Sequence, residues 1–509
     1  MKLIEELSSV STRTFAVVDL GSNSARVVVL RADTAGRLDV LHEVRAPLRL
    51  VRELDTEGAL TAEAEHRALD ALADFRAVAL GAGADQILIV ATAAVREAPN
   101  GPAFVKLIHE RLGLGVRVLS GAEEAQYALL GALYGLPCEH GISIDVGGGS
   151  MQIVHFRNRA AINTWSLPLG ALRLSDAFLK TDPPTAAEVA ALQEHVCSAL
   201  VGAGVPTLAP DEQLIGTGGT VRNLARVDRR EVEYPIQKVH GYVLPTVRLR
   251  RITSVLVERS QRARQTVIGL NEDRADSIAG GALAVQTVVE QVQAEEIVVS
   301  GQGLREGIVH GLLAPTLPRP AIVRQTSLRL LAGRFSSWTA VAADRRRAIA
   351  CAIASAVPPS NWEAADALGN AAYIVDVGRS MDYYRRFTHA ADIVQAADLA
   401  GFSHRALAFL IASLRAGAGG KVRLKSLAPL LSRRDEADIE WAGAILAFAD
   451  EMEYRCEPAR RLAVSCIRRN DEIVLSVPLI QGSSISSVQA RLEKATGSHL
   501  RLEIAGTEA

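Results

Sequence analysis

The sequence predicts an α/β protein with two duplicated α/β domains and a cleft between them, followed by an all-α region and a small α/β appendage. A strand–turn–strand pattern occurs twice. The turn at residues 19–24 (DLGSNS) follows the apolar run 15–18, and the turn at 145–150 (DVGGGS) follows the run 142–144. Both copies place an acid at the end of the first strand, and strands alternate with helices after each copy. A repeated first hairpin indicates an ancient duplication.

The alternation continues along the first 310 residues. In the first domain, runs 27–30 and 87–91 read as strands, and runs 61–81 and 101–112 read as helices. In the second domain we expect strands near 141 and 213 and at 296–300, with helices at 185–201, 246–264 and 271–291.

A proline-rich connector at 314–320 (APTLPRP) ends this alternation, because a helix does not tolerate prolines at that density. Residues 322–455 are rich in Ala, Leu and Arg and have helical periodicity. Later, β-rich runs at 462–468 and 472–478 precede a helix at 486–495 and a strand at 500–504. The predicted domains are therefore 1–135, 136–313, 320–456 and 457–509.

The composition excludes several classes of protein. The chain has 509 residues, too many for one core, and 49% of them are hydrophobic. A net charge of −1 and only 4% aromatic residues argue against nucleic acid as a partner. The five cysteines form no C-x-x-C pair, residues 1–14 lack an apolar signal-peptide core, and no stretch could span a bilayer. We therefore expect a cytoplasmic protein with no membrane partner.

The two turns indicate the chemistry. Backbone N–H groups and hydroxyls in a Gly/Ser-rich turn can surround a phosphate, and Asp19 and Asp145 can hold a magnesium ion beside it. Two such turns facing each other across a cleft would bind a polyphosphate chain. One turn alone is typical of an ordinary hairpin. The pairing, with three successive glycines at 147–149, favours a binding site because glycines cost conformational entropy.

A helix start supplies a candidate catalytic carboxylate. Ser120 and Glu123 have the spacing of a capping box, which opens a helix running through Leu133. Glu124 is rotated by about 100° from Glu123 around the helix axis and is free to point into the cleft. A carboxylate beside a bound phosphate is a natural general base for water. The alternative is compensation of the helix dipole.

Two further segments could bind anions. Arg96 follows the strand at 87–91 and could clamp a phosphate with its planar guanidinium; the alternative is an exposed arginine at a helix start. The turn at 215–220 (IGTGGT) lies between a strand and a helix and offers helix N–H groups, although close packing also explains it. Arg274 is a weaker candidate, because a solvated cluster at the start of a helix fits residues 271–276 better.

These motifs resemble, in order, the exopolyphosphatase/guanosine pentaphosphate phosphatase family of the actin/hexokinase/heat-shock-chaperone superfamily. The resemblance covers residues 15–310. Besides the two hairpins it rests on 120–125 (SGAEEA), 216–220 (GTGGT), 240–241 (HG), 274–276 (RAD) and 303–307 (GLREG). It implies two ribonuclease-H-like domains and hydrolysis of a terminal phosphoanhydride bond with Mg²⁺, or with Mn²⁺.

The resemblance also implies roles for individual residues. Glu124 matches the family's catalytic glutamate, which activates water, and Asp19 and Asp145 match the acids near the metal. The phosphate-binding residues expected from the resemblance and from the turns are Ser22, Asn23, Ser24, Arg96, Gly147, Gly148, Gly149, Ser150, Gly218, Gly219 and Thr220.

Two departures from the family pattern concern the site. Gln152 stands where the family's Gly-Gly-Gly-Ser-Thr-Glu loop has its glutamate, and Gly301 stands where the family often has an aspartate. An amide does not neutralise a cation, so we expect an altered affinity or preference for the metal.

The helical region resembles the family's HD-like module without its metal ligands. Val375 replaces a histidine before Asp376, and Asp376 with His389 alone cannot assemble a two-metal site. We therefore expect this region to be non-catalytic. Its arginines either line a track for a long polyanion or form a solvated helix surface: Arg379, Arg385, Arg386, Arg405 and Arg415.

The leading function is a processive exopolyphosphatase that acts on inorganic polyphosphate and forms a homodimer. The same residues could instead remove the 5′-γ-phosphate of guanosine pentaphosphate. Gln152 also leaves open a non-catalytic sensor of polyphosphate or of guanosine penta- or tetraphosphate. A kinase or chaperone ATPase of the same superfamily is less consistent with the sequence, because we find no acceptor site.

Overall fold

The computed structural model describes residues 12–33, 36–54, 57–314, 316–419, 424–456, 462–480 and 485–504. The chain forms two compact units. One contains the residues up to Glu233 together with Lys238–Pro320, and the other contains Tyr234–Gln237 and Ala321–Ala509. The units meet in sequence at the predicted proline-rich connector, of which Pro315 lies outside the described residues. The finer division into four domains stays a prediction.

The first unit contains a five-stranded sheet in the order β3-β2-β1-β4-β5. Its strands are β1 (Arg13–Leu20), β2 (Ala25–Ala32), β3 (Leu38–Ala46), β4 (Gln86–Ala91) and β5 (Val116–Val118). β1 pairs antiparallel with β2 and parallel with β4, so Asp19 lies opposite Arg26 on one side and Val90 on the other. This places Asp19 at the carboxyl end of a central strand.

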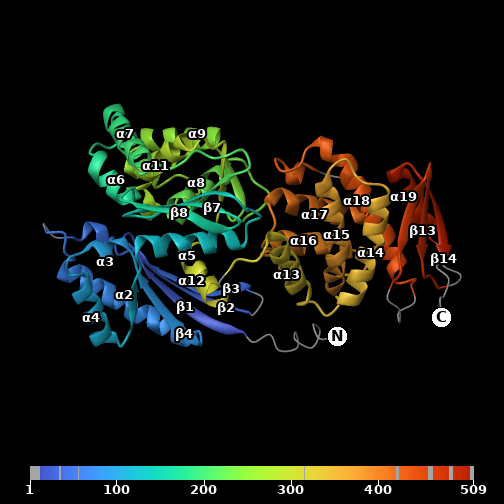
Figure 1. Ribbon diagram of the computed structural model, residues 1–509, viewed down its shortest axis with the longest axis horizontal. Helices are drawn as coiled ribbons and strands as arrows, with labels where there is room; N and C mark the ends of the chain where they lie inside the picture. Colours follow the sequence, from blue (N-terminus) through green and yellow to red (C-terminus); the bar gives the residue numbers. More distant parts are fainter. Residues whose placement is uncertain are drawn as a thin grey trace. The chain divides into compact units, whose positions relative to one another are not determined.

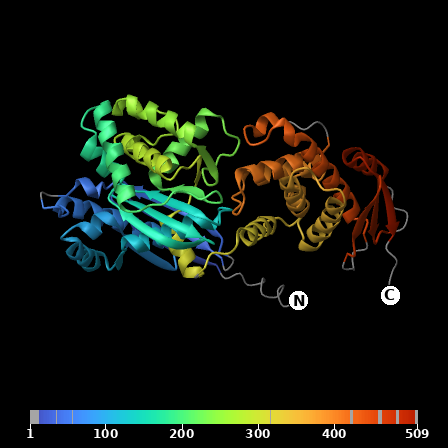
Figure 2. The same cartoon turned by 45° about the horizontal axis from the view of Figure 1, so that its top comes forward.

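A second sheet in the same unit has six strands in the order β10-β11-β9-β6-β7-β8. They are β6 (Gly141–Val146), β7 (Met151–Arg157), β8 (Ala160–Leu167), β9 (Gln213–Thr217), β10 (Tyr242–Pro245) and β11 (Glu296–Val299). With β6 in the place of β1, this order repeats that of the first sheet and adds β10 at one edge. Figure 2 shows the antiparallel strands β6, β7 and β8 of this sheet side by side. The shared strand order is what duplication predicts.

The helices of this unit agree with the predictions except at two places. They are η1 (Leu50–Arg52), α2 (Ala62–Gly81), α3 (Ala93–Glu97), α4 (Gly101–Leu112), α5 (Gly121–Tyr134), α6 (Ala171–Phe178), α7 (Ala186–Gly202), α8 (Gly218–Glu231), α9 (Thr246–Glu258), α10 (Gln261–Arg264), η2 (Glu272–Arg274), α11 (Ile278–Gln291) and α12 (Leu304–Leu313). The helix expected at 246–264 is broken, because Ser260 caps a separate α10. The helix expected from Asn271 begins at Ile278, after the short 3₁₀ turn η2.

Two helices each pack against the other sheet than the one that they follow in sequence. α12 follows the last strand of the second sheet, yet its Ile308 and Val309 pack on Phe15, Val17 and neighbours in the first sheet. α5 follows the first sheet, yet its Ala125 and Leu129 belong to the core of the second. The two helices lie against each other between the sheets (Figure 1). We call the parts built on the first and second sheets the first and second lobes.

The second unit is mainly helical. Its helices are α13 (Pro320–Ala332), α14 (Ala340–Ala356), α15 (Trp362–Ile374), η3 (Val375–Ser380), α16 (Arg386–Ala396), α17 (His404–Gly417), η4 (Leu424–Leu427), η5 (Arg433–Asp435), α18 (Glu436–Glu453) and α19 (Ser486–Thr496). The β-rich runs and the last strand expected near the C-terminus are observed as β12 (Ser465–Arg469), β13 (Glu472–Val477) and β14 (His499–Ile504), in that order in one sheet. None of the described helices is long and apolar enough to cross a membrane.

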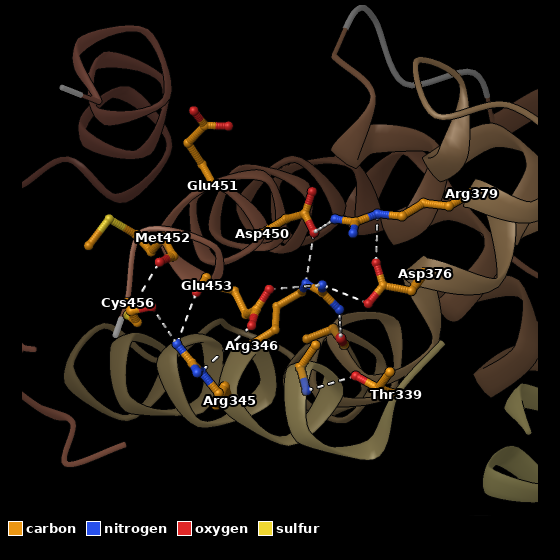
Figure 3. Close-up of polar contacts among 12 residues, drawn as sticks. Thr339, Arg345, Arg346, Asp376, Arg379, Asp450, Glu451, Met452, Glu453 and Cys456 are labelled. Carbon is orange, nitrogen blue, oxygen red and sulfur yellow. Dashed lines mark hydrogen bonds and ion pairs between the residues drawn. The ribbon is translucent and has the colours of Figure 1, made fainter. Parts of the chain in front are cut away.

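An arginine lies buried at the centre of this helical unit (Figure 3). Arg346, fully inaccessible to solvent, donates from Nη2 to Asp376 Oδ2 at 2.8 Å, and its Nε lies 2.8 Å from Asp450 Oδ1. Asp376, which the HD-like resemblance singles out, is therefore engaged by a guanidinium. Arg379 also pairs with Asp376, at 2.8 Å. The HD-like identity of this region stays a prediction.

Most of the arginines considered for a polyanion track have carboxylate partners. Arg386 pairs with Asp450 at 2.6 Å, Arg405 with Asp435 at 2.7 Å, and Arg415 with Asp392 at 3.2 Å. These arginines are neither simply solvated nor free of counter-charge. The structure therefore gives no support to a continuous cationic track along them.

Candidate active site

The two predicted turns meet in one pocket between the lobes. The turn after β1 and the turn after β6 touch so closely that a Cβ on Gly149 would lie 2.7 Å from Ser22 Oγ. A Cβ on Gly148 would likewise lie 2.9 Å from the Cβ of Asn23. At such distances the neighbouring atoms would have to shift, so the contact between the two turns favours glycine at 148 and 149.

The pocket brings together most of the predicted site residues. Its lining includes Asp19, Ser22, Asn23, Ser24, Glu124, Asp145, Gly147, Gly148, Gly149, Ser150, Gly218 and Gly219. Two predicted phosphate ligands are not part of the lining. Thr220 is buried in α8, and Arg96 lies behind Glu124, where it contacts that carboxylate. Direct phosphate binding by these two residues is therefore not what the geometry favours.

Glu124 reaches the pocket because of the way in which α5 begins. Ser120 Oγ accepts from the Glu123 backbone N–H at 3.2 Å, and Glu123 Oε2 accepts from the Ser120 N–H at 2.9 Å, which completes the predicted capping box. Glu123 points outward and also pairs with Arg117. Glu124, one position further around the helix, is 9% exposed and faces the pocket.

Arg96 fixes one oxygen of the Glu124 carboxylate. Its Nη1 donates to Glu124 Oε2 and to the Leu119 carbonyl, both at 2.9 Å. The pKa of Glu124 is raised to about 7, chiefly by burial. The Arg96 guanidinium opposes this rise, whereas Asp145 and Asp19 add to it. A carboxylate whose pKa lies near neutrality can accept a proton and release it again.

Asp19 and Asp145 lie at the ends of equivalent strands. Burial raises the pKa of Asp19, while Arg305 and Arg26 oppose the rise. Burial likewise raises the pKa of Asp145 to about 6, and Arg222 opposes it. A cation between such carboxylates would restore their charged forms.

The donor set fits a hard divalent cation such as Mg²⁺. In the described part of the chain, no group of three or more His, Cys, Asp or Glu side chains is placed to hold a metal. Asp19 and Asp145 both line the pocket and are the candidate protein ligands. Mg²⁺ is commonly bound through one or two carboxylates, with water and substrate phosphate oxygens completing its shell.

Hydrogen-bond donors for an anion surround the two turns. Asn23 is 6% exposed, and its Nδ2 has no hydrogen-bond partner although it is buried. Ser22 and Ser150 are similarly buried at the pocket wall. A buried donor without an acceptor is costly, and a phosphate oxygen would supply the missing partner.

Gln152 lies beside the second turn as a neutral side chain. Its Nε2 donates to Ser150 Oγ at 2.8 Å and to Ser166 Oγ at 3.3 Å. With Ser150 Oγ accepting from Gln152, the hydroxyl proton of Ser150 is free to be donated to a phosphate. The amide therefore leaves the Ser150 proton available and adds no negative charge to the pocket lining.

Sequence reasoning missed a group of arginines in the same pocket. Arg26 from β2, Arg222 from α8 and Arg305 from α12 all line it. Burial lowers the pKa of Arg26 to about 9, and the nearby positive charges of Arg305 and Arg222 lower it further. Glu43 already pairs with Arg26 at 3.2 Å and with Arg305 at 3.0 Å, so an anion in the pocket would meet a partly neutralised group of guanidinium charges.

Arg274 is buried in the pocket lining, so the solvated cluster that the sequence favours over a phosphate contact is wrong. It is 7% exposed and lines the pocket, and its guanidinium lies where a Cβ on Gly219 would come within 2.4 Å. Local signals existed for some of the missed residues. Arg26 lies two positions after Ser24, just inside β2, and Arg222 follows Gly218 by about one helical turn.

Comparisons with known proteins agree with this geometry. The sequence profile of the Ppx/GppA phosphatase family matches residues 28–315. Exopolyphosphatase 1 of Mycobacterium leprae is 28% identical over 317 residues, which cover 62% of this chain and 93% of that protein. Exopolyphosphatase 1 of Mycobacterium tuberculosis is 27% identical over 317 residues, with 61% and 92% covered.

Solved structures show the same relationship. A Ppx/GppA family member from Aquifex aeolicus is 27% identical with a TM-score of 0.53, and the match covers 60% of this chain and 98% of that one. An exopolyphosphatase from Cytophaga hutchinsonii is 25% identical with a TM-score of 0.54, covering 59% and 98%. The relatives are thus matched over almost their whole length.

Proposed function

We propose, from the premise that this chain belongs to the Ppx/GppA phosphatase family, that it removes terminal phosphates processively from inorganic polyphosphate. The protein is a hydrolase of phosphoanhydride bonds, as its exopolyphosphatase relatives indicate. The proposal concerns its substrate, its catalytic residue and its metal.

One observation carries the proposal: Glu124 faces a pocket formed by the two Gly/Ser-rich turns. The carboxylate is fixed by Arg96 at 2.9 Å, and its pKa is raised to about 7, mainly by burial. Around it the pocket offers the unpartnered Nδ2 of Asn23 and several arginines. This combination of a base and anion-binding groups suits attack by water on a bound phosphate.

In the proposed reaction the turns hold the terminal phosphate by backbone N–H groups and by the side chains of Asn23 and Ser150. Glu124 accepts a proton from a water molecule, whose oxygen forms a bond to the terminal phosphorus. The bond from that phosphorus to the bridging oxygen breaks, and the electron pair stays with the shortened chain. Orthophosphate is the second product. Since Arg96 holds Oε2, Oε1 is the oxygen left for the water.

A divalent cation would be held by Asp19 and Asp145. When bound, it supplies neutralisation of phosphate charge, which phosphoryl transfer requires. We propose Mg²⁺, with Mn²⁺ as the alternative. The neutral amide of Gln152 is a basis for a difference in metal preference from relatives that carry a glutamate at this position.

The helical unit contributes no catalytic metal in this proposal. The carboxylates of Asp376 and Asp450 are engaged by Arg346, which argues against a metal at that position. A homodimer also stays a prediction. Size-exclusion chromatography with light scattering tests it.

The deciding experiment measures phosphate release from long-chain polyphosphate and from guanosine pentaphosphate with Mg²⁺ at equal phosphate concentrations. We expect faster release from polyphosphate, and full-length chains should persist beside the accumulating free phosphate, without a build-up of chains of intermediate length. Faster release from the nucleotide would assign the chain as a guanosine pentaphosphate phosphohydrolase. No release from either compound, with binding retained, would make it a sensor.

A further inference from the structure

Each phosphate-binding turn is backed by one short element. Behind the first turn, η1 contributes two hydrogen bonds: Val51 N donates to the Ser22 carbonyl at 3.2 Å, and Arg49 N donates to the Asn23 carbonyl at 2.9 Å. Displacement of η1 therefore displaces the turn that carries the predicted phosphate ligands.

The second turn is backed in the same way by α6. Ala171 N donates to the Gly147 carbonyl at 2.9 Å, and Leu172 N donates to the Gly148 carbonyl at 3.0 Å. The first residues of α6 thus use the turn's carbonyls as acceptors, and the start of the helix is joined to the turn through the backbone.

Arg52 joins these two elements across the lobes. Its Nε donates to Asp176 Oδ2 at 2.8 Å and its Nη2 donates to Asp176 Oδ1 at 2.6 Å. Asp176 lies on α6, whereas Arg52 is the last residue of η1. A two-pronged contact of this kind fixes orientation as well as distance.

The remaining nitrogen of the same guanidinium contacts a third element. Arg52 Nη1 donates to Asp276 Oδ2 at 2.5 Å, and Arg49 Nη1 lies 3.0 Å from the same oxygen. The Asp276 side chain is only 9% exposed, and Asp276 follows the pocket residue Arg274 by two positions. Arg52 therefore links one lobe to two pocket-forming segments of the other.

The backbone of η1 shows that its position is imposed. Arg49 has φ 54° and ψ 38°, a left-handed conformation that is unfavourable for a side chain other than glycine. Such a conformation persists where the surroundings determine it. Here the surroundings are the turn carbonyl, contacted by the Arg49 N–H, and Asp276, contacted by its guanidinium.

An isolated surface ion pair contributes little to stability, and the contacts of Arg52 are of another kind. One guanidinium uses three nitrogens on two carboxylates, and both carboxylates belong to the opposite lobe. Together these contacts connect the backbones of the two turns that touch at Ser22 and Gly149.

We propose that Arg52 is a positioning residue: its contacts with Asp176 and Asp276 hold the two phosphate-binding turns in a fixed position relative to each other across the lobes. It touches neither substrate nor metal and acts through η1 and α6. The effect on turnover rests on the proposed function. The effect on the backbone of the two turns does not.

The test compares wild type with Arg52→Gln, Arg52→Lys and Asp176→Asn. Hydrogen exchange is followed in peptides covering 48–53 and 170–175, and phosphate release from long-chain polyphosphate is measured in parallel. In Arg52→Gln we expect exchange to be about tenfold faster in both segments, since both lose a shared support. We expect kcat to fall about ten- to a hundredfold, because small misplacement of reacting groups is costly.

The conservative and control variants separate positioning from general destabilisation. Arg52→Lys keeps the positive charge but loses the two-pronged contact with Asp176. Its kcat should therefore lie between those of Arg52→Gln and wild type. Arg250→Gln removes the exposed Arg250–Glu290 pair of 2.9 Å, which lies within the second lobe, and should change neither readout. Should Arg52→Gln fail to fold, Asp176→Asn removes the fork and leaves the contact with Asp276.

Faster exchange confined to 48–53 would overturn the proposal, since α6 would then not be coupled to η1. If exchange became faster in both segments while kcat stayed within twofold of wild type, the proposed effect of Arg52 on turnover would be overturned. An inactive wild type would instead refute the proposed function. The exchange data would then still decide whether Arg52 couples the two turns.

Discussion

Replacement of Arg96 by glutamine should move the pH profile of the reaction. Arg96 Nη1 donates to Glu124 Oε2 at 2.9 Å, and their side chains are 22% and 11% exposed. The positive charge favours the ionised carboxylate, so its loss raises the pKa of Glu124 above its present value of about 7. Because the base is the carboxylate, activity must be lost on the acid side.

The magnitude follows from the strength of the contact. A hydrogen bond to a charged group contributes about 1.5–3 kcal/mol, and about 1.4 kcal/mol corresponds to one pH unit. The acid limb of kcat/KM should therefore move up by about one to two pH units. At pH 7 the ionised fraction then falls from about one half to about 1–10%, and kcat/KM falls about 5- to 50-fold.

The assay is phosphate release at low polyphosphate concentration between pH 5 and 10, because kcat/KM reports groups of the free enzyme. In Arg96→Gln the rate should approach that of wild type at the alkaline end, and Arg96→Lys should lie between the two. A rate that falls equally at every pH, with an unmoved acid limb, would refute the assignment of Glu124 as the titrating base.

Three further outcomes are expected. Asp145→Asn should raise the Mg²⁺ concentration for half-maximal activity at least tenfold, since a charged ligand is lost; an unchanged metal titration would exclude Asp145 as a ligand. Gly149→Ala should abolish most turnover, because its Cβ would lie 2.7 Å from Ser22 Oγ, whereas Gly81→Ala, with nothing within 4 Å, should be silent. Arg346→Met should destabilise the helical unit by up to about 3–5 kcal/mol in denaturant unfolding, since the carboxylates of Asp376 and Asp450 lose their fully buried partner and keep only Arg379 and Arg386. Equal midpoints for wild type and Arg346→Met would show that the buried network contributes nothing.

The features predicted correctly from the sequence are those with local causes. Capping by Ser120 and Glu123 depends on residues three apart, and it determines which glutamate faces the pocket. The two hairpins likewise have their acids and glycines within six residues. Their equivalence in the two sheets follows from the same strand order.

Other features depend on tertiary contacts and could not be predicted in this way. Arg222 and Arg305 come from helices of different sheets, and they meet Arg26 only because α12 crosses onto the first lobe. The segment before α11 also has a distant partner: the Asn271 N–H donates to Asn223 Oδ1 at 2.9 Å, a contact that no local pattern reveals.

Arg96 shows how a correct residue can be given the wrong partner. Its position after a strand predicts a positively charged side chain near the pocket. Arg96 does lie near the pocket, in contact with the lining residue Glu124. Its guanidinium is nevertheless engaged by Glu124 and the Leu119 carbonyl, which belong to a later segment of the chain. The same reasoning applies to Asp376, whose partner Arg346 lies thirty positions earlier.

The central claim is that Glu124 activates water at a phosphate held by the two turns. Its most direct test compares phosphate release by wild type and Glu124→Gln with Mg²⁺, alongside binding of long-chain polyphosphate to both. The account predicts a loss of kcat of about a hundredfold or more with binding unchanged, as expected for removal of a general base. Turnover within a few fold of wild type would contradict it.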